Sequence, residues 1–338
     1  PEVIGTAEAG WTHRESAHYR VTALTNNTGA CTMRATIFIG VLMLCASPVT
    51  AQITCGTADD TTAIQQAIDE ARTIFDPVAP VQVVQLPPGP CYVSSLNMTA
   101  RAGIMLRGPS LLIPITSGSV VLDLSGSAAI TLRDIRIGGQ NNLGHSTGVQ
   151  GTVPRLGILI SQIAGPLDGW SNKIILDTVQ VDGEYSVGTV FILGVPSSQI
   201  LNSQFTQFYP SPNVWITGNW WWDSMSPYQT MVAHATSLPT DWTITGTEFH
   251  NFAQQAGLWI GAAQDIRIYG GNISAKGFVA VDINAVSFEG QGIGPARIIL
   301  DGTTFYSDSG VQGPCAVRGA EGVVSFRANF HSQPSLTC

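Results

Sequence analysis

Four side chains in the second half of the chain could carry general acid–base chemistry: Asp223, Glu248, His250 and Asp282. Carboxylates and imidazole rings are effective acids and bases when their pKa lies near the working pH. In a strand that buries Phe249, the neighbouring Glu248 and His250 both point to the outer face. Hydrolysis of a glycosidic bond by two carboxylates needs them roughly 5 Å apart for retention, or about 6.5–9.5 Å apart for inversion.

Asp182 could supply a further carboxylate close to this pair. In the repeated pattern described below, Asp182 falls in the same column as His250, two repeats earlier. Neighbouring strands lie about 4.8 Å apart, so this column would place the two residues about two strand spacings from each other.

Aromatic side chains lie in the same region of the sequence. If Val214, Ile216, Leu258, Ile260, Val281 and Ile283 point inward, alternation places one column outward: Phe191, Trp215, Trp259 and Asp282. Aromatic rings pack against the apolar faces of sugar rings, so the column is predicted to be a substrate platform. The alternative is that a loop or a partner subunit covers it.

A long insertion, residues 219–241, follows the Trp215 strand. It carries Trp221, Trp222 and Asp223. A run of tryptophans either packs on the coil surface as a small core or contacts a ligand. Trp221 and Trp222 are therefore candidate substrate-binding residues, and Asp223 is a candidate acid that the insertion could bring over Glu248 or Asp282.

A short phrase, repeated from about residue 130 onward, positions these candidates. Its copies are LRDIRI (132–137), LDTVQV (176–181), ILNSQF (200–205), ITGTEF (244–249), IYGGNI (268–273), LDGTTF (300–305) and SFRANF (325–330). Most copies have an apolar residue at each end and a turn-forming Asp, Asn or Gly early in the phrase. The final apolar residues are separated by 44, 24, 44, 24, 32 and 25 positions. The short separations are typical of one solenoid turn, and the two of 44 indicate one turn with an insertion or two turns.

A second short apolar strand follows six of the phrases. These strands are GILIS (157–161), GTVFILG (188–194), PNVWITG (212–218), AGLWIGA (256–262), VAVDIN (279–284) and CAVRG (315–319). Strands and turns at this period, with no helices between them, predict an all-β solenoid, the parallel β-helix. An antiparallel sandwich is the alternative, but it would show hairpin signals rather than an aligned phrase.

One amphipathic helix is predicted near the start, in ADDTTAIQQAIDEA (58–71). Ile64, Ala67, Ile68 and Ala71 form one apolar stripe, and Thr62 with Gln65 could form a capping box. A solenoid needs a cap, because its end coil exposes core and unpaired strand edges. We therefore expect this helix to lie over the first coil.

Composition excludes some functions. Only 11% of the residues are charged, 36 of the 338 are glycine, and the formal net charge is −8. Few charges and many glycines suit a large all-β protein with tight turns. A nucleic-acid partner is not expected, because it would call for a basic patch.

The N-terminal part reads as a targeting segment. Residues 33–51 have a short basic start, an apolar stretch and a small-residue cleavage site, which predicts a signal peptide and a periplasmic or extracellular protein. Residues 1–32 precede Met33 and are interpreted as an upstream extension outside the native protein. The predicted mature chain, residues 52–338, is one β-helix domain with no expected membrane association, and nothing in it predicts an oligomeric state.

Four cysteines remain in the predicted mature chain. Cys55 and Cys91 lie near its start, and Cys315 and Cys338 near its end. In an oxidising compartment each pair would close one loop as a disulfide. The alternative is four unrelated thiols. No Cys or His cluster suggests a metal.

The helix segment, with VQVVQLPPGPCYVSSLNM (81–98) and IMLRG (104–108), resembles the opening of pectate-lyase-superfamily and family-28-related domains. The resemblance covers about 50 residues. It implies a right-handed parallel β-helix with the helix as its N-terminal cap, acting on acidic or cell-surface polysaccharide. The paired aspartates and the Gly-His-Gly motif of polygalacturonases are not matched, and Gly144-His145-Ser146 is the most similar segment.

Together these features predict a secreted glycoside hydrolase or polysaccharide lyase with a polysaccharide as its partner. Hydrolysis is favoured over elimination, because basic residues near the aromatic column are scarce and no calcium-binding cluster of carboxylates can be read. No cofactor is expected, and Ca²⁺ would be needed only by a lyase. One alternative is a non-catalytic carbohydrate-binding or surface-attachment β-helix protein. A phage tailspike depolymerase is the third reading, and the signal peptide argues against it.

Overall fold

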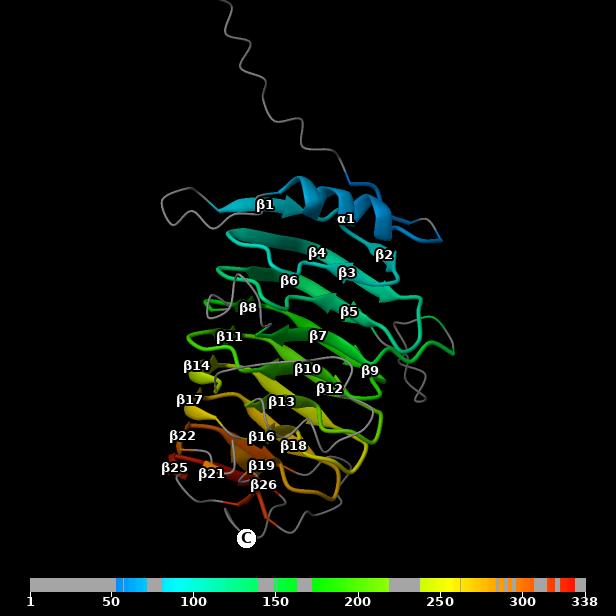
Figure 1. The fold of residues 1–338 in the computed structure, drawn as a ribbon. Helices are drawn as coiled ribbons and strands as arrows, with labels where there is room; N and C mark the ends of the chain where they lie inside the picture. The colour runs from blue at the N-terminus through cyan, green and yellow to red at the C-terminus, as the bar shows by residue number, and fades with distance from the viewer. Residues whose placement is uncertain are drawn as a thin grey trace, which may run out of the picture. The chain divides into compact units, whose positions relative to one another are not determined.

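The structure is a computed structural model of a parallel β-helix preceded by one helix (Figure 1). It describes residues 53–56, 58–71, 81–138, 149, 151–162, 172–218, 238–261, 263–283, 286–288, 291–293, 296–306, 315–319 and 323–331. The predicted extension, 1–32, and the predicted signal peptide, 33–51, lie outside these residues.

Three parallel sheets form the coils. Sheet 1 contains β1 (Gln82–Gln85), the first parts of β4 (Ile104–Pro114) and β6 (Thr131–Gly138), β8 (Ile175–Asp177), β11 (Gln199–Leu201), β14 (Thr240–Thr245), β17 (Gln264–Tyr269), β22 (Ala296–Asp301) and β25 (Val323–Phe326). Sheet 2 contains β2 (Pro90–Val93), the second parts of β4 and β6, β9 (Gln180–Gly183), β12 (Gln204–Gln207), β15 (Glu248–Asn251), β18 (Asn272–Ala275), β23 (Thr304–Tyr306) and β26 (Asn329–His331).

Sheet 3 closes each coil. It contains β3 (Leu96–Asn97), β5 (Val120–Asp123), β7 (Leu156–Ser161), β10 (Gly188–Leu193), β13 (Val214–Thr217), β16 (Leu258–Ile260), β19 (Val281–Ile283) and β24 (Val317–Arg318). A small antiparallel hairpin, β20 (Val286–Phe288) and β21 (Gln291–Ile293), lies between β19 and β22 in the chain.

The repeat predicted from the sequence is the register of sheet 2. Its final apolar positions are direct neighbours from strand to strand: Ile137, Val181, Phe205, Phe249, Ile273, Phe305 and Phe330. The six predicted second strands are β7, β10, β13, β16, β19 and β24, in that order in sheet 3. The predicted parallel β-helix is therefore confirmed, including its unequal turn lengths.

The turn residues of the phrase form the corner between sheets 1 and 2. Residues with a positive φ lie at each of these corners: Asp134, Thr178, Asn202, Gly246, Gly270 with Gly271, Gly302 and Arg327. Four of their N–H groups, those of Thr178, Asn202, Gly246 and Gly270, donate to a carbonyl of the next coil at 2.7–2.9 Å. Each corner can therefore bend sharply while the hydrogen-bond ladder continues.

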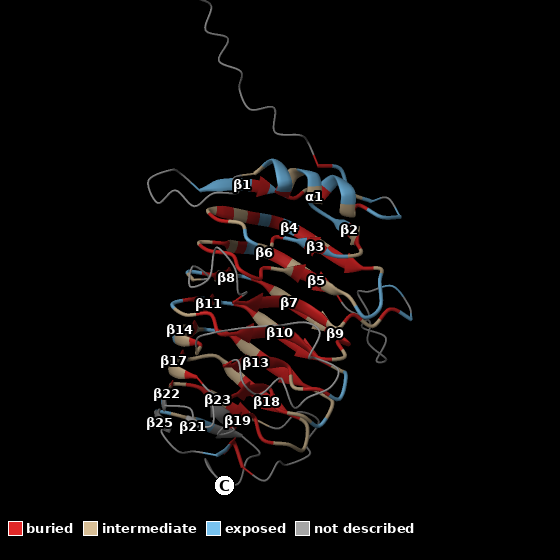
Figure 2. Cartoon of the chain, in the orientation of Figure 1, coloured by how far each residue is buried: buried red, intermediate tan, exposed pale blue. Residues whose placement is uncertain are grey.

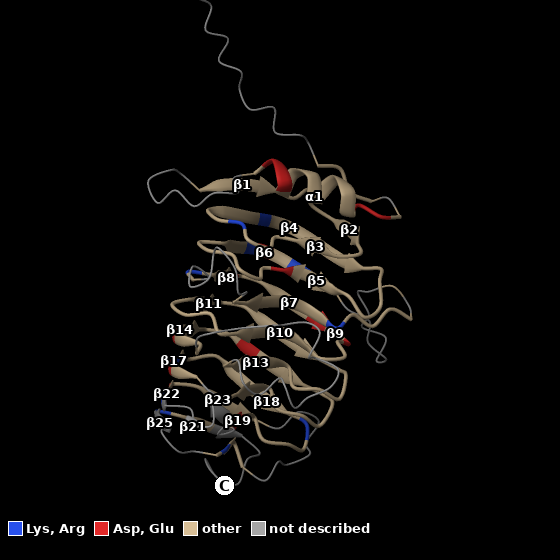
Figure 3. Ribbon diagram, viewed as in Figure 1, with Lys and Arg blue, Asp and Glu red and all other residues tan. Residues whose placement is uncertain are grey.

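Stacked coils share one apolar core. It extends from Ile53 to Val317, and most of its members have no exposed surface. In Figure 2 strands of the middle coils such as β7 and β10 are coloured as buried, whereas α1 and β1 show much exposed surface. Figure 3 shows few charged residues on the strands, in keeping with the low charge of the sequence.

The helix α1 (Thr61–Glu70) lies over the first coil (Figure 1). Ile64 and Ile68 are fully buried in the core, and Ala67 and Ala71 pack against it. The predicted cap is therefore confirmed. The predicted capping box is wrong, because Asp60 is the N-cap and the Gln65 side chain instead pairs with the backbone of Asn97 in the first coil.

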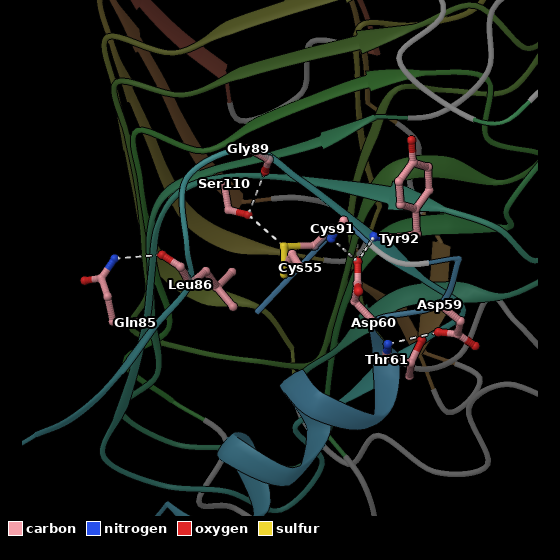
Figure 4. The surroundings of a disulfide bond; sticks show 11 residues. Cys55, Asp59, Asp60, Thr61, Gln85, Leu86, Gly89, Cys91, Tyr92 and Ser110 are labelled. Carbon is pink, nitrogen blue, oxygen red and sulfur yellow. Dashed lines mark hydrogen bonds between the residues drawn. A yellow bond between two sulfur atoms is a disulfide. The ribbon is translucent and has the colours of Figure 1, made fainter. Parts of the chain in front are cut away.

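A disulfide joins Cys55 to Cys91, as predicted. Beside it, the Asp60 carboxylate accepts a hydrogen bond from the N–H of Tyr92, and the N–H of Asp60 donates to the Tyr92 carbonyl (Figure 4). The segment before α1 is thus fixed to β2 by covalent and polar contacts. Cys338, the predicted partner of Cys315, lies outside the described residues, so the second disulfide stays a prediction.

Candidate active site

Two polar columns run along the outer face of sheet 2. They flank the buried Phe205 and Phe249 column, so alternation turns their side chains outward. The first column contains Arg136, Gln180, Gln204, Glu248, Asn272, Thr304 and Asn329. The second contains Asp182, Thr206, His250, Ser274 and Tyr306.

A groove of about 480 Å³ lies over these columns. Its lining residues come from β6, β9, β12, β15 and β23 and from the segments after β12 and β15: Arg136, Gln180, Asp182, Gln204, Thr206, Phe208, His250, Phe252 and Tyr306. Cationic, anionic, amide and aromatic side chains therefore face one space.

His250 is the centre of a hydrogen-bond network in the groove. Its Nε2 lies 3.2 Å from Glu248 Oε2, and its Nδ1 lies 3.0 Å from Ser274 Oγ and 2.8 Å from the Tyr306 hydroxyl. The Asn272 amide donates to the other oxygen of Glu248 at 3.2 Å. The side chain of Glu248 is 42% exposed and that of His250 only 11%. The predicted pair therefore forms, with Glu248 open to solvent and His250 almost covered.

Asp182 and Arg136 form an ion pair on the other side of the groove. Arg136 donates to Asp182 Oδ2 at 3.3 Å, while the Nε of Arg136 is buried without a hydrogen-bond partner. Burial, together with the nearby charge of Asp182, raises the pKa of the core residue Tyr185. Since Arg136 is 41% exposed, its guanidinium can reach a ligand in the groove.

The register places Asp182 and His250 in one column two strands apart, with Thr206 between them, and Glu248 lies two residues before His250 in β15. Two strand spacings are about 10 Å. The side chains of Asp182 and His250 both line the groove, one on each side of Thr206. A separation of this size between Asp182 and His250 leaves room for a water molecule between an acid and a base.

Phe208 and Phe252 form an aromatic wall of the groove. Their rings stack at 5.0 Å with an interplanar angle of 7°, and both are half-buried. Each ring follows the buried phenylalanine of its phrase by three positions. Exposed parallel rings of this kind offer a flat apolar surface to a sugar ring.

No family model matches the chain, and no curated protein matches it. Among solved structures, PfbA, a surface adhesin of Streptococcus pneumoniae, aligns over 84% of this chain and 80% of its own, with 13% identity and a TM-score of 0.51. ORF18 of Geobacillus virus E2 aligns over 84% of this chain and 58% of its own, with 13% identity and a TM-score of 0.47. Endo-xylogalacturonan hydrolase from Aspergillus tubingensis aligns over 84% and 94%, with 12% identity and a TM-score of 0.36.

The chain has a right-handed parallel β-helix fold, which it shares with PfbA. The resemblance read from the opening segment is therefore confirmed at the level of fold. Identities of 12–13% show the fold alone, so the activity must be argued from the groove.

The predicted aromatic column exists but is not open. Phe191, Trp215, Trp259 and Asp282 are neighbours in sheet 3, and their side chains point away from the main core, as predicted. All four are at most 5% exposed. With Leu156, Leu159, Val187 and Leu193, the three aromatic residues form a second apolar cluster. The column is thus a buried surface in this structure, and sugar binding by it stays a prediction.

Asp282 ends that column in an ion pair. Arg318, its neighbour in β24, donates from Nε to Asp282 Oδ1 at 2.9 Å and from its NH2 group to Oδ2. The pair raises the pKa of Arg318, chiefly through these hydrogen bonds. Asp282 does not line the groove, so the structure does not bring it together with Glu248 and His250.

Three predicted site residues, Trp221, Trp222 and Asp223, lie outside the described residues. In the part of the chain that is described, no group of three or more His, Cys, Asp or Glu side chains could hold a metal ion. No described helix is long and apolar enough to cross a membrane.

Sequence reasoning missed seven of the nine groove residues: Arg136, Gln180, Gln204, Thr206, Phe208, Phe252 and Tyr306. Arg136 and Tyr306 share the columns of Glu248 and His250, so extending the aligned phrase to both ends of the solenoid would have found them. The two phenylalanines repeat with the same 44-residue spacing as Phe205 and Phe249. The groove residues can therefore be found from the aligned repeat, and no local motif marks them.

Proposed function

We propose that this protein binds a polysaccharide in the groove on sheet 2 and hydrolyses it. The observation that carries the proposal is the groove shared by Asp182, His250 and the Phe208–Phe252 stack, with Glu248 hydrogen-bonded to His250. The aromatic wall would hold a sugar ring, and the amides of Gln180 and Gln204 would bond its hydroxyls.

The acid and base roles follow from the neighbours of each group. Arg136 pairs with Asp182, so Asp182 remains a carboxylate and can take a proton from the attacking water. On the other side of Thr206, His250 is hydrogen-bonded to Glu248, and this pair supplies the proton for the leaving sugar oxygen. A separation of about two strands leaves room for water, which favours inversion at the anomeric carbon.

Elimination from a uronate polymer is the second candidate, and Arg136 is the observation that favours it. Its Nε has no hydrogen-bond partner and its guanidinium lines the groove, where it could neutralise a uronate carboxylate. Elimination would use His250 or Tyr306 as the base, and it would not need two carboxylates.

The proposed location is extracellular or periplasmic. The Cys55–Cys91 disulfide supports this, because such bonds persist in oxidising compartments. The signal peptide predicted at residues 33–51 agrees with it.

The test is a panel of acidic and neutral polysaccharides, with reducing ends and the ultraviolet absorbance of unsaturated uronate followed together. Hydrolysis predicts reducing ends without absorbance, and elimination predicts both. Asp182→Asn and Glu248→Gln should each lower cleavage by about 10²–10⁴-fold. Asp241→Asn, on the outer face of sheet 1, is the matched control and should leave cleavage unchanged. Binding without cleavage by the wild-type protein would replace the enzyme with a carbohydrate-binding β-helix.

A further inference from the structure

Tyr306 reaches His250 across a small residue. The two lie in the same column with Ser274 between them, so their backbones are about two strand spacings apart. Because Ser274 is small and fully buried, the phenol extends over it and its hydroxyl lies 2.8 Å from His250 Nδ1. The two rings are 5.7 Å apart between centroids, at 58° to each other.

Oxygen atoms face both nitrogens of the His250 ring. Nε2 faces the Glu248 carboxylate, whose other oxygen already accepts from the Asn272 amide. A carboxylate only accepts, so the proton of a neutral ring belongs on Nε2. Nδ1 faces the hydroxyls of Tyr306 and Ser274, and a hydroxyl can either donate or accept. The same partners therefore suit both the neutral ring and the imidazolium.

We propose that Tyr306 is the catalytic proton donor of the groove and draws its proton from His250. The proposal rests on the proposed hydrolysis and names the group that meets the leaving oxygen. Tyr306 and His250 both line the groove, but both ring nitrogens of His250 already face oxygen atoms and its side chain is only 11% exposed. A proton of the His250 imidazolium is therefore passed to the polymer by way of the Tyr306 hydroxyl.

The step balances in protons and electrons. The bond between the anomeric carbon and the leaving oxygen breaks, and its electron pair goes to that oxygen. This oxygen takes the proton of the Tyr306 hydroxyl, while Nδ1–H of the His250 imidazolium gives its proton to the Tyr306 oxygen. His250 is left neutral with its proton on Nε2, still facing Glu248. On the other side, Asp182 takes a proton from the water whose oxygen bonds to the anomeric carbon.

Nitrogen-15 NMR of the full chain, without polymer, tests the contact itself. The chain has six histidines, and comparison with His250→Gln identifies the His250 signals. The expected result is a ring that carries a proton on Nε2 both when it is neutral and when it is an imidazolium, and whose Nδ1 resonance moves in Tyr306→Phe but not in Tyr269→Phe. Tyr269 is 37% exposed on sheet 1 and serves as the control. A ring protonated on Nδ1 alone, or an Nδ1 signal that Tyr306→Phe leaves unmoved, would overturn the proposal.

Kinetics test the donor role. Tyr306→Phe should lower kcat on the cleaved polymer by about 100-fold with little change in KM. A nitrophenyl glycoside of the same sugar needs no proton on its leaving group, so Tyr306→Phe should retain most of its rate on that substrate. Equal losses on both substrates would indicate a merely structural role and overturn the proposal, as would an unchanged rate on the polymer. A wild-type protein that cleaves nothing would instead reject the proposed hydrolysis, which separates the two failures.

Discussion

The outer faces of sheets 2 and 3 obey the same register but have opposite surroundings. On sheet 2, the columns of Glu248 and His250 flank a buried phenylalanine column and line an open groove. On sheet 3, the column of Trp215 and Trp259 also points away from the core, yet it is almost completely buried. Register therefore decides which side chains stack, whereas the neighbouring segments decide whether the stack is exposed to solvent.

The carboxylates on the outer faces of sheets 2 and 3 also differ in exposure and in hydrogen-bond partners. Asp282 is 5% exposed and held by Arg318 through two hydrogen bonds. Glu248 is 42% exposed, and its bonds come from His250 and Asn272. The Asp282 carboxylate is buried and held by two hydrogen bonds from a guanidinium, which suits a structural role, whereas the Glu248 carboxylate is exposed and bonded to an imidazole, which suits proton transfer.

The largest expected effect of a substitution on folding lies in the buried column. Trp215→Ala removes a ring that packs at 4.7 Å from Trp259 and donates from Nε1 to the Val187 carbonyl. Its free energy of unfolding should fall by about 3–5 kcal/mol, because a large cavity and an unpaired carbonyl remain. Urea unfolding followed by circular dichroism measures it.

Phe208→Ala is the matched substitution on the groove side. The ring is half-buried, so its removal should cost clearly less stability than Trp215→Ala. If Trp215→Ala were as stable as the wild type and lost only polysaccharide binding, the outer face of sheet 3 rather than that of sheet 2 would be the binding surface.

A smaller effect is expected at the end of the column. Arg318→Ala leaves the buried Asp282 without its partner, and should lower the free energy of unfolding by about 2 kcal/mol. Asp282→Asn should cost less, because Arg318 is 47% exposed and can turn to water and to the Phe278 ring. Thermal unfolding of the two variants ranks them, and a costlier Asp282→Asn would contradict the structural role of this pair.

The smallest effect concerns Tyr185, in the core close to Asp182. Its hydroxyl is buried without a hydrogen-bond partner, and burial raises its pKa well above 10. The unfolded state therefore releases this proton first, so stability falls as pH rises above about 10. Tyr185→Phe should be within about 1 kcal/mol of the wild type at neutral pH, and should lose less stability between pH 9 and pH 11. Urea midpoints at these pH values measure it, and an equal alkaline loss in both proteins would contradict this reading.

The repeat made most of the fold predictable. The end positions of each phrase, such as Phe205 and Phe249, are the inward positions of sheet 2, and this fixed every other column by alternation. The same alternation correctly placed Glu248, His250 and the outward Trp215 column. Burial was not predictable, because it depends on what packs over a face, and that is set by segments whose length and path the repeat does not describe.

Long-range contacts were also beyond local reasoning. Arg136 lies 46 residues from Asp182, and Tyr306 lies 56 residues from His250. Each pair meets because the solenoid stacks distant coils, and one small side chain, Ser274, decides that the phenol can reach the imidazole. Such a contact becomes visible only once the columns are aligned through the whole solenoid.

The central claim is that the groove on sheet 2, rather than the aromatic column on sheet 3, binds the polymer. Affinity electrophoresis in gels that contain each polysaccharide of the panel tests it most directly. We predict that the double variant Phe208→Ala and Phe252→Ala raises the dissociation constant at least about tenfold, while Trp259→Phe binds as the wild type does. Unchanged binding by the double variant, with binding lost in a folded Trp259→Phe, would contradict the account and place the working surface on sheet 3.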